Sequence, residues 1–199
     1  MAYGADDITD INEWKDKKED KDLLVEKYIV EIAKGNTDYM KNLYDSISSS
    51  VYGYAFSLLK NSDDAGDVLH DCFLKIYNAA PGYSPCGKPF SWIFTITKNL
   101  CMQKFRENSK QADAPDEDME NFGAINNTLS AEDSLIIKEC MTILADDERQ
   151  IVILHAVSGY KHREIADFLE IPLATVLSKY NRALKKLNDK LTEGGAYDE

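Results

Sequence analysis

The sequence predicts an all-α protein of two small helical domains joined by a flexible acidic linker, the C-terminal domain being a helix-turn-helix. Apolar residues recur at helical spacing along most of the 199-residue chain, and no stretch alternates cleanly between apolar and polar residues. The chain holds only 10 glycines and 5 prolines, so long helices are expected between few breaks. Two basic segments are separated by an acidic one, which is typical of two modules and a linker.

The N-terminal region is expected to be a mobile acidic arm over residues 1–21, because it is charged and only weakly periodic. A first domain is predicted over residues 22–110. It begins with a helix that starts at Asp22 and ends at the Gly35-Asn36 break. A second helical pattern follows over residues 37–59.

A third helical pattern, residues 63–80, has an apolar side and an acidic side. Ser62 or Asp63 is placed to cap its first turn. The simplest interpretation is an amphipathic helix with a solvated acidic face. The functional interpretation is a docking face for a protein partner.

Residues 81–90 hold three prolines and two glycines and are predicted to form a loop. The next segment, residues 91–110, interleaves aromatic side chains with cations and amides, which are the groups that hold unstacked bases and phosphates. Its polar residues are therefore candidates for nucleic-acid contact. Its apolar residues are expected in the core instead: Trp92, Ile93, Ile96 and Leu100.

Residues 111–133 carry seven acids and no Lys or Arg, so they are expected to form the acidic linker. A second domain is predicted over residues 134–192, with a disordered tail over residues 193–199.

Within this second domain, residues 144–187 have the pattern of three short helices with two sharp breaks. Gly159 is expected to end the first helix with a positive φ, and Pro172 to open the third. One face of the third helix is hydroxyl and basic, which fits the major groove of duplex DNA. The alternative is a three-helix packing unit whose polar face is only solvated.

These motifs, in this order and spacing, resemble the extracytoplasmic-function (ECF) group of bacterial RNA polymerase sigma factors over nearly all of residues 22–190. The recurring runs of the first module stand here as DAGDVLHDCFLKIY at 64–77 and WIFTITKN at 92–99. Those of the second module stand as LADDER at 144–149, GYKHREIA at 159–166 and PLATVLS at 172–178.

The resemblance implies three contact surfaces. The acidic helix would dock on the clamp coiled coil of the largest subunit of core RNA polymerase, through Asp64, Asp67, His70, Asp71, Phe73 and Lys75. The loop and the helix after it would hold the minus-ten promoter element as single strand, through Lys88, Lys98, Asn99, Gln103, Lys104 and Arg106. The helix-turn-helix would read the minus-thirty-five element as duplex, through Lys161, His162, Arg163, Thr175, Ser178, Lys179, Arg182 and Lys185.

Several positions depart from the family pattern. Phe90, Thr95, Glu107 and Leu177 stand where basic residues are frequent, so weaker DNA affinity and a smaller salt dependence are expected. Glu170 stands where glycine is common in the turn. These departures motivate a second hypothesis, a sigma-like regulator that binds polymerase or an anti-sigma partner without melting promoter DNA. An anti-sigma protein is itself a partner that the resemblance implies.

A helical enzyme is the third hypothesis, and the sequence does not favour it. It contains no His-Glu-x-x-His motif, glycine-rich phosphate loop or Cys-His metal spacing, so no catalytic residue, cofactor or metal is expected. His155 is expected to pack at a core edge instead. The four cysteines are scattered and are expected to be unpaired thiols in a reducing cytoplasm.

The net charge of −12 argues against a protein that coats nucleic acid indiscriminately. The acidic N-terminus does not have the pattern of a secretory signal, and no apolar run is long enough to cross a membrane. A cytoplasmic location is therefore expected, with no direct insertion into a membrane.

Overall fold

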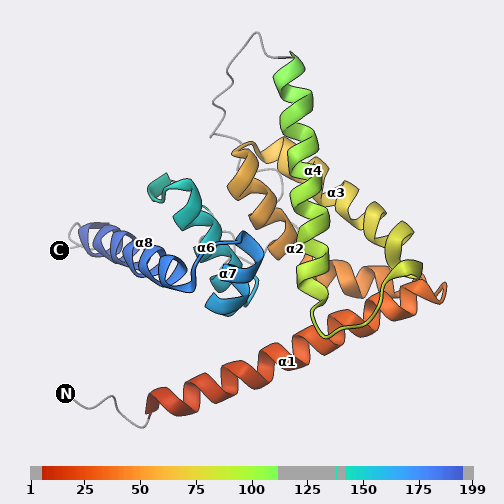
Figure 1. Ribbon diagram of the computed structural model, residues 1–199, viewed down its shortest axis with the longest axis horizontal. Coiled ribbons are helices and arrows are strands. Elements are labelled where there is room, and N and C mark those ends of the chain that lie inside the picture. The colour runs from red at the N-terminus through yellow and green to blue at the C-terminus, as the bar shows by residue number, and fades with distance from the viewer. Residues whose placement is uncertain (1–5, 112–137, 139–141, 195–199) are drawn as a thin grey trace.

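The computed structural model describes the backbone of residues 6–111, 138 and 142–194, and these residues contain helices and no β-strand (Figure 1). This confirms the all-α prediction. The elements are α1 (Asp6–Ala33), α2 (Tyr39–Leu59), α3 (Ser62–Ala79), the 3-10 helix η1 (Ala80–Gly82), α4 (Pro89–Gln111), α6 (Asp146–Ala156), α7 (His162–Leu169) and α8 (Leu173–Gly194).

Helix α1 begins at Asp6, well before the start at Asp22 that the apolar periodicity predicts. Much of the expected arm is thus helical, because Lys and Glu have good helix propensity. Its C-terminal half is fixed by Val25 and Ile29, which are fully buried. The helix ends as predicted, two residues before Gly35, which adopts a φ of 93°.

Helix α2 lies at the centre of the described helices. Its contacts reach α1, α3 and α4 and also α6 of the C-terminal module. Small residues on α2, among them Ser50, Gly53 and Ala55, let neighbouring helices approach closely, while Tyr52 and Tyr54 fill the wider gaps. A helix that is buried on several sides, rather than along one stripe, lies at the centre of a core.

Asn61, not Ser62 or Asp63, caps α3. The Asn61 side chain accepts a hydrogen bond from the Asp64 amide at 2.9 Å, and its own backbone is extended. Ser62 is already the first helical residue and is buried, so the predicted cap was one residue too late. Because Lys60 ends α2 in the left-handed conformation, the chain turns within two residues.

The two predicted modules share one hydrophobic core in the described residues. The Tyr54 ring of α2 lies 5.2 Å from the Phe94 ring of α4 and 5.7 Å from the Phe168 ring of α7. Phe94 also packs edge-on against Tyr160, with 5.5 Å between centroids. We call these four rings the aromatic junction. Because it fills the space between the modules, they form one packed body.

Polar contacts reinforce this packing. The buried Ser50 hydroxyl donates to the Val157 carbonyl at 3.3 Å, and Lys60 Nζ lies 2.9 Å from Asp146 Oδ1. The Lys60 ammonium is the main cause of a lowered Asp146 pKa. Most of the predicted linker, residues 112–133, lies outside the described residues.

We predict that Phe168→Ala lowers the free energy of unfolding by about 2–3 kcal/mol, because the half-buried ring leaves a cavity between α2, α4 and α7. Chemical denaturation followed by circular dichroism measures the change. Phe105→Ala is the matched control, since this ring is 39% exposed on α4, and a change within about 0.5 kcal/mol is expected. Equal losses in the two variants would show that the aromatic junction does not hold the modules together.

Candidate nucleic-acid interface

Helix α8 turns its apolar side to its own module and leaves its polar side at the surface. Val176 and Ala183 are fully buried, whereas Ser178 and Lys185 are exposed and the Arg182 side chain is 60% exposed. Thr175 is half-buried at the start of the helix, as is Lys179 on its flank. The predicted DNA-facing residues therefore form a surface on α8, with Thr175 and Lys179 at its edge.

The turns before α7 and α8 have the geometry of a helix-turn-helix. Gly159 adopts a φ of 75° after α6, as the sequence predicts. Glu170 ends α7 with a φ of 57°, and its amide donates to the Ala166 carbonyl. This conformation favours glycine and costs another residue about 1–2 kcal/mol. The Thr175 and Val176 amides then donate to the Pro172 carbonyl, which starts α8.

An acidic turn of α6 lies against the basic flank of α8. Glu148 is only 3% exposed, and its carboxylate oxygens lie 2.6 Å from Lys186 Nζ and 3.7 Å from Arg182 Nη1. Lys179 forms an ion pair with Asp147. Burial raises the pKa of Glu148, but the hydrogen bonds from Lys186 and the Ala145 amide outweigh it and lower the pKa overall. In the sequence these acids stand out only as part of the LADDER run at 144–149, with no sign of their basic partners.

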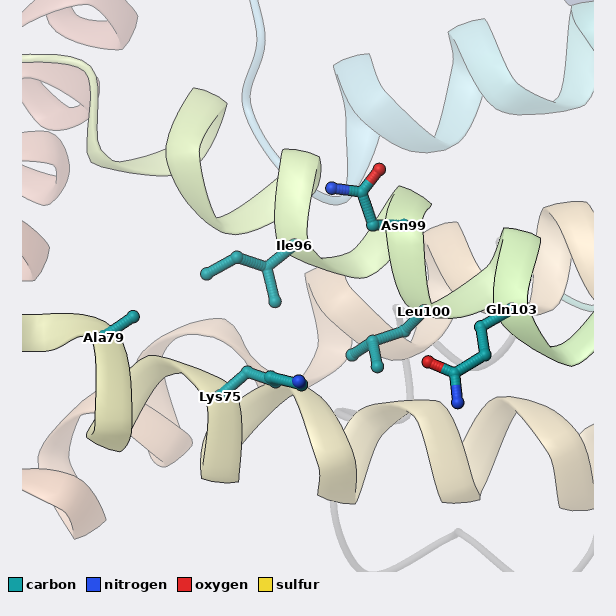
Figure 2. Close-up of a pocket in the computed structure, with 6 residues that line it drawn as sticks. All are labelled: Lys75, Ala79, Ile96, Asn99, Leu100 and Gln103. Atoms are coloured by element: carbon teal, nitrogen blue, oxygen red, sulfur yellow. The ribbon is translucent and has the colours of Figure 1, made fainter.

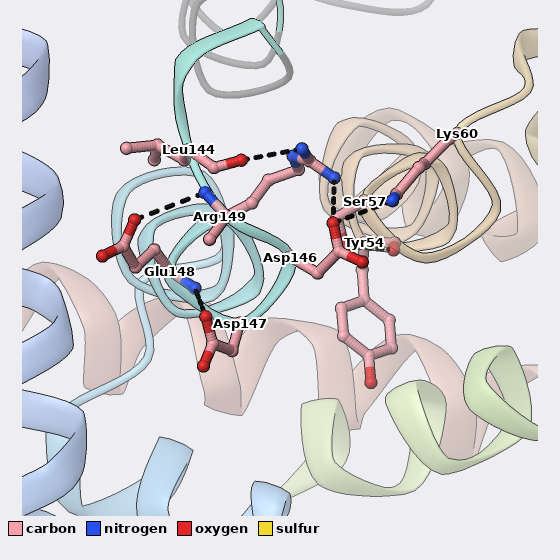
Figure 3. A network of polar contacts seen from close by, with 9 residues as sticks. Tyr54, Ser57, Lys60, Leu144, Asp146, Asp147, Glu148 and Arg149 are labelled. Atoms are coloured by element: carbon pink, nitrogen blue, oxygen red, sulfur yellow. Dashed lines mark hydrogen bonds and ion pairs between the residues drawn. The ribbon is translucent and has the colours of Figure 1, made fainter. Parts of the chain in front are cut away.

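Arg149 stabilises the same turn of α6 from its other side. Its guanidinium donates to the Leu144 carbonyl at 2.8 Å and to Asp146 at 3.2 Å (Figure 3). Asp146 in turn forms an ion pair with Lys60, just after α2, so the base of the helix-turn-helix is tied to the N-terminal module. Arg149 is buried, and its role is to hold this turn.

The residues predicted on α7 are not equally available. Arg163 is exposed and Lys161 is half-buried. The His162 ring stacks on His155 with 4.3 Å between centroids and packs edge-on against Tyr180 at 4.5 Å. Burial, and then the neighbouring His155, lowers the pKa of His162, which favours the neutral ring. His162 therefore belongs to the interior edge of the module, beside His155, whose predicted core-edge position is confirmed.

Helix α3 presents a mixed acidic and apolar surface. Asp67, His70, Asp71 and Lys75 are exposed as predicted, and Asp64 is half-buried. Phe73 is not part of this surface. It is 7% exposed and its ring lies 4.8 Å from Tyr44 of α2, because it falls on the apolar side of the helix.

Two large apolar residues on the exposed side of α3 were missed. Leu74 is 51% exposed and Tyr77 is 45% exposed. They stand next to the predicted docking residues, and the sequence singled them out only as members of the run at 64–77. Exposed leucine and tyrosine beside charges are common at protein interfaces.

Residues predicted to bind polymerase and residues predicted to bind the minus-ten strand contact one another between α3 and α4. The sequence had assigned them to two separate surfaces. Lys104 Nζ lies 2.7 Å from Asp67 and 3.4 Å from Asp64, and Asn108 donates to Asp64 at 2.9 Å. The hydrogen bond with Asp67 is the main cause of a raised Lys104 pKa. The ammonium therefore stays protonated, and the neighbouring carboxylates already balance its charge. Lys104 consequently offers less charge to a phosphate than its type suggests.

A groove of about 230 Å³ lies between the same two helices. Lys75 and Ala79 of α3 and Ile96, Asn99, Leu100 and Gln103 of α4 line it, and Figure 2 shows the Leu100 and Gln103 side chains turned toward α3. The apolar residues form one part of its lining, and the ammonium and amide groups form the rest. Such a lining suits a flat apolar group with a polar edge.

The remaining minus-ten candidates are spread along α4 and the loop before it. Lys88 and Arg106 are exposed, as are Asn99 and Gln103 at the groove. Lys98 is half-buried, and its ammonium lies 5.8 Å from the centroid of the Phe168 ring of α7. The packing of the two modules therefore covers this cation.

Of the four apolar residues assigned to the core of α4, Ile93 and Leu100 are buried and Trp92 and Ile96 are half-buried. Three cysteines are free thiols, as predicted, while Cys140 lies outside the described residues. The described residues include no cluster of three or more His, Cys, Asp or Glu that could bind a metal ion. Among the helices described, none is long and apolar enough to cross a membrane.

Known protein families match both parts of this architecture. Sigma-70 region 2 matches residues 43–111, and sigma-70 region 4 matches residues 134–187. The relatives include the ECF RNA polymerase sigma factor SigK of Mycobacterium ulcerans, 26% identical over 172 residues, which are 81% of this chain and 90% of that protein. The chain belongs to the ECF group of sigma factors. SigW of Bacillus subtilis, another ECF sigma factor, is 22% identical over 187 residues, 86% of this chain and 99% of that protein.

Two solved structures share the fold. CnrH, in complex with the cytosolic domain of CnrY, superimposes with a TM-score of 0.56 at 20% identity, over 85% of this chain and 98% of that one. RpoE from Bartonella quintana, in complex with the anti-sigma factor NepR, gives a TM-score of 0.59 at 22% identity, over 82% and 99%. The arrangement of helices in this sigma factor is thus a known one.

We predict that Glu148→Gln strengthens binding to duplex DNA and steepens its salt dependence, because Lys186 and Arg182 lose their buried counter-ion. The slope of log affinity against log salt should grow by about one to two. Fluorescence anisotropy with a labelled duplex over a salt series measures it. Asp167→Asn, the same charge change at an exposed position of α7, should leave the slope unchanged.

Glu148→Gln also tests how the free energy of unfolding depends on pH. At pH 7 its free energy of unfolding should be lower by about 2 kcal/mol, because charge-assisted hydrogen bonds are lost. The lowered pKa of Glu148 contributes stability above the ordinary value of 4.5 and loses it as the pH falls through the folded-state pKa. The difference between the two proteins should therefore shrink below pH 4.5. A difference that grows in acid would refute this account.

Proposed function

We propose that this ECF sigma factor binds core RNA polymerase through α3 and reads promoter DNA through α4 and α8. The observation that supports it best is the separation of two surfaces of different character. Acidic α3 and basic α8 lie on opposite sides of the packed helices (Figure 1). Because the surfaces are apart, one can engage the enzyme while the other engages duplex DNA. The protein contributes specificity to the polymerase in the cytoplasm and catalyses no reaction of its own.

In this proposal the polymerase contact combines charge with apolar area. Asp71, His70 and Lys75 supply polar contacts to the clamp coiled coil, and Leu74 and Tyr77 supply the apolar contact that a stable interface needs. Asp67 and Asp64 act mainly by holding Lys104, so they orient α4 relative to the docking helix.

The opened minus-ten strand would lie along α4. The groove beside Asn99 and Gln103 can accept an unstacked base. The exposed Lys88, just before α4, and Arg106, on α4, can bind phosphates. Lys98 can bind phosphate as well only when α7 moves away from α4, because Phe168 covers it while the two modules are packed together, which we call the closed arrangement. Opening of the two modules would therefore accompany promoter binding.

The minus-thirty-five duplex would meet the outer face of α8. Ser178, Arg182 and Lys185 are exposed there, and Arg163 of α7 is exposed as well. Hydroxyl groups and cations of this kind read base edges and phosphates in the major groove. An anti-sigma protein is a further proposed partner, since the superimposed sigma factor RpoE is bound to the anti-sigma factor NepR.

A second candidate function is a regulator that binds polymerase without opening DNA. It is favoured because Phe168 covers Lys98 and Asp67 pairs with Lys104, which leaves fewer cations for the opened strand. Run-off transcription with core polymerase separates the two. Promoters are first mapped from the transcripts that appear when the protein is overproduced. Specific initiation at those promoters supports a sigma factor, and stable polymerase binding without any initiation supports the regulator.

We predict that Arg182→Ala with Lys185→Ala lowers affinity for the minus-thirty-five duplex about tenfold to a hundredfold and leaves polymerase affinity unchanged. Asp71→Lys should do the reverse. Asp71 is chosen because it is exposed, whereas a lysine at Asp67 would also disturb Lys104. Duplex anisotropy and polymerase pull-down titrations measure the two affinities.

Asp38→Lys, an equal charge change at an exposed position before α2, is the control for Asp71→Lys and should alter neither affinity. Loss of the same activity in both test variants would disprove the separation of the two surfaces.

A further inference from the structure

One carboxylate oxygen of α1 holds the loop between η1 and α4. Glu26 Oε1 accepts a hydrogen bond from the Tyr83 hydroxyl at 2.8 Å and from the Cys86 and Gly87 amides at 2.9 Å each. Glu26 lies about sixty residues before this loop in the sequence, so the contact joins two distant segments. No motif in the sequence indicates it.

The three donors fix the shape of the loop. Gly87 has a φ of 69°, which directs its amide and that of Cys86 toward the same acceptor. A carboxylate is a stronger acceptor than water or an amide, and two adjacent amides on one oxygen define the local backbone. Tyr83 is fixed on its other side by Trp92, 4.8 Å away between centroids.

Burial raises the pKa of Glu26, but the hydrogen bonds from Tyr83, Gly87 and Cys86 outweigh it and lower the pKa overall. The carboxylate is therefore ionised at neutral pH. The pKa of its partner Tyr83 is raised, first by burial and then by the hydrogen bond to Glu26.

Helix α1 does not need this carboxylate for its own attachment. Val25, Ile29 and Ile32 are buried against the core on the same helix and secure it there. The contribution of Glu26 falls on the loop instead, and the loop leads directly to Lys88 and to the start of α4 at Pro89.

We propose that Glu26 is a positioning residue that orders residues 83–87 in advance for capture of the opened promoter strand. This inference rests on the proposed function of the loop and of α4. A loop that is already ordered loses less conformational freedom when it binds, which increases affinity for the unpaired strand. Glu26 itself touches no DNA in this scheme.

The test uses holoenzyme assembled from the full chain and core polymerase, on a promoter mapped as above. Two DNA probes are compared: a template with an unpaired bubble across the minus-ten element, and a fully paired duplex that carries only the minus-thirty-five element. Glu26→Ala should weaken bubble binding about tenfold and leave the duplex affinity unchanged. Glu26→Gln should restore part of the loss, because its amide oxygen can still accept from the two backbone amides.

Glu31→Ala is the matched control. Glu31 lies on the same helix, and its carboxylate accepts hydrogen bonds from Lys34 and Asn36 near the helix end, at 2.7 and 2.5 Å. It should bind the bubble as the parent protein does. Equal weakening in Glu31→Ala and Glu26→Ala, or no weakening in either, would overturn the proposal.

A direct readout of loop order comes from Cys86, an exposed free thiol within the loop. A nitroxide label is attached there in a Cys140→Ser background, since Cys72 and Cys101 are buried. The label should become more mobile in Glu26→Ala but not in Glu31→Ala. An unchanged spectrum with Glu26→Ala would show that the carboxylate does not order the loop.

The outcomes distinguish this inference from the proposed function. If the parent holoenzyme neither binds the bubble nor initiates, the proposed function fails. If the parent initiates and Glu26→Ala binds the bubble equally well, only the positioning role fails.

Discussion

Burial of α2 on several sides is the constraint on which the structure depends. The N-terminal helices and α6 pack on it, and Tyr54 on α2 joins the rings of Phe94 and Phe168. Its small residues allow the close approach, and its large ones fill the remaining space. Since α3, α4 and α6 all take their positions from this helix, so do the surfaces that they carry.

The closed arrangement links packing to function through a few charged groups. Phe168 helps to join the modules and also covers Lys98, so contacts that stabilise the closed body reduce the cationic surface of α4. On the other module, Glu148 holds Lys186 and Arg182 at the edge of α8. In the proposed function, internal acids would thus moderate the affinity of these basic residues for DNA. A protein with a net charge of −12 can in this way confine its DNA contacts to a small surface.

Local features could be predicted from sequence because local chemistry determines them. The apolar periodicity predicted that the chain is helical, and Gly159 and Pro172 predicted the breaks of the helix-turn-helix. Ile93 and Leu100 were assigned correctly to the core. The cap of α3 was placed one residue late, since several neighbouring residues can all serve as caps. The outward direction of Arg182 and Lys185 also follows from helical spacing.

Features that depend on contacts between distant segments could not be predicted in this way. Nothing in the periodicity shows that α7 packs on α4, that Lys104 pairs with Asp67, or that Glu26 reaches Gly87. Phe73 was assigned to a surface because the family motif contains it, although its spacing places it on the buried side of α3. The partner of a side chain is set by tertiary packing, which a single sequence does not specify.

The most direct test of two separate contact surfaces is site-specific photo-crosslinking in the complete initiation complex. A photoreactive phenylalanine analogue replaces Leu74 on α3 or Leu177 on α8, both of which are exposed in the free protein. Crosslinks from position 74 to the largest polymerase subunit, and from position 177 to duplex DNA upstream of the opened region, are the predicted result. Crosslinks from both positions to the same partner would contradict the account.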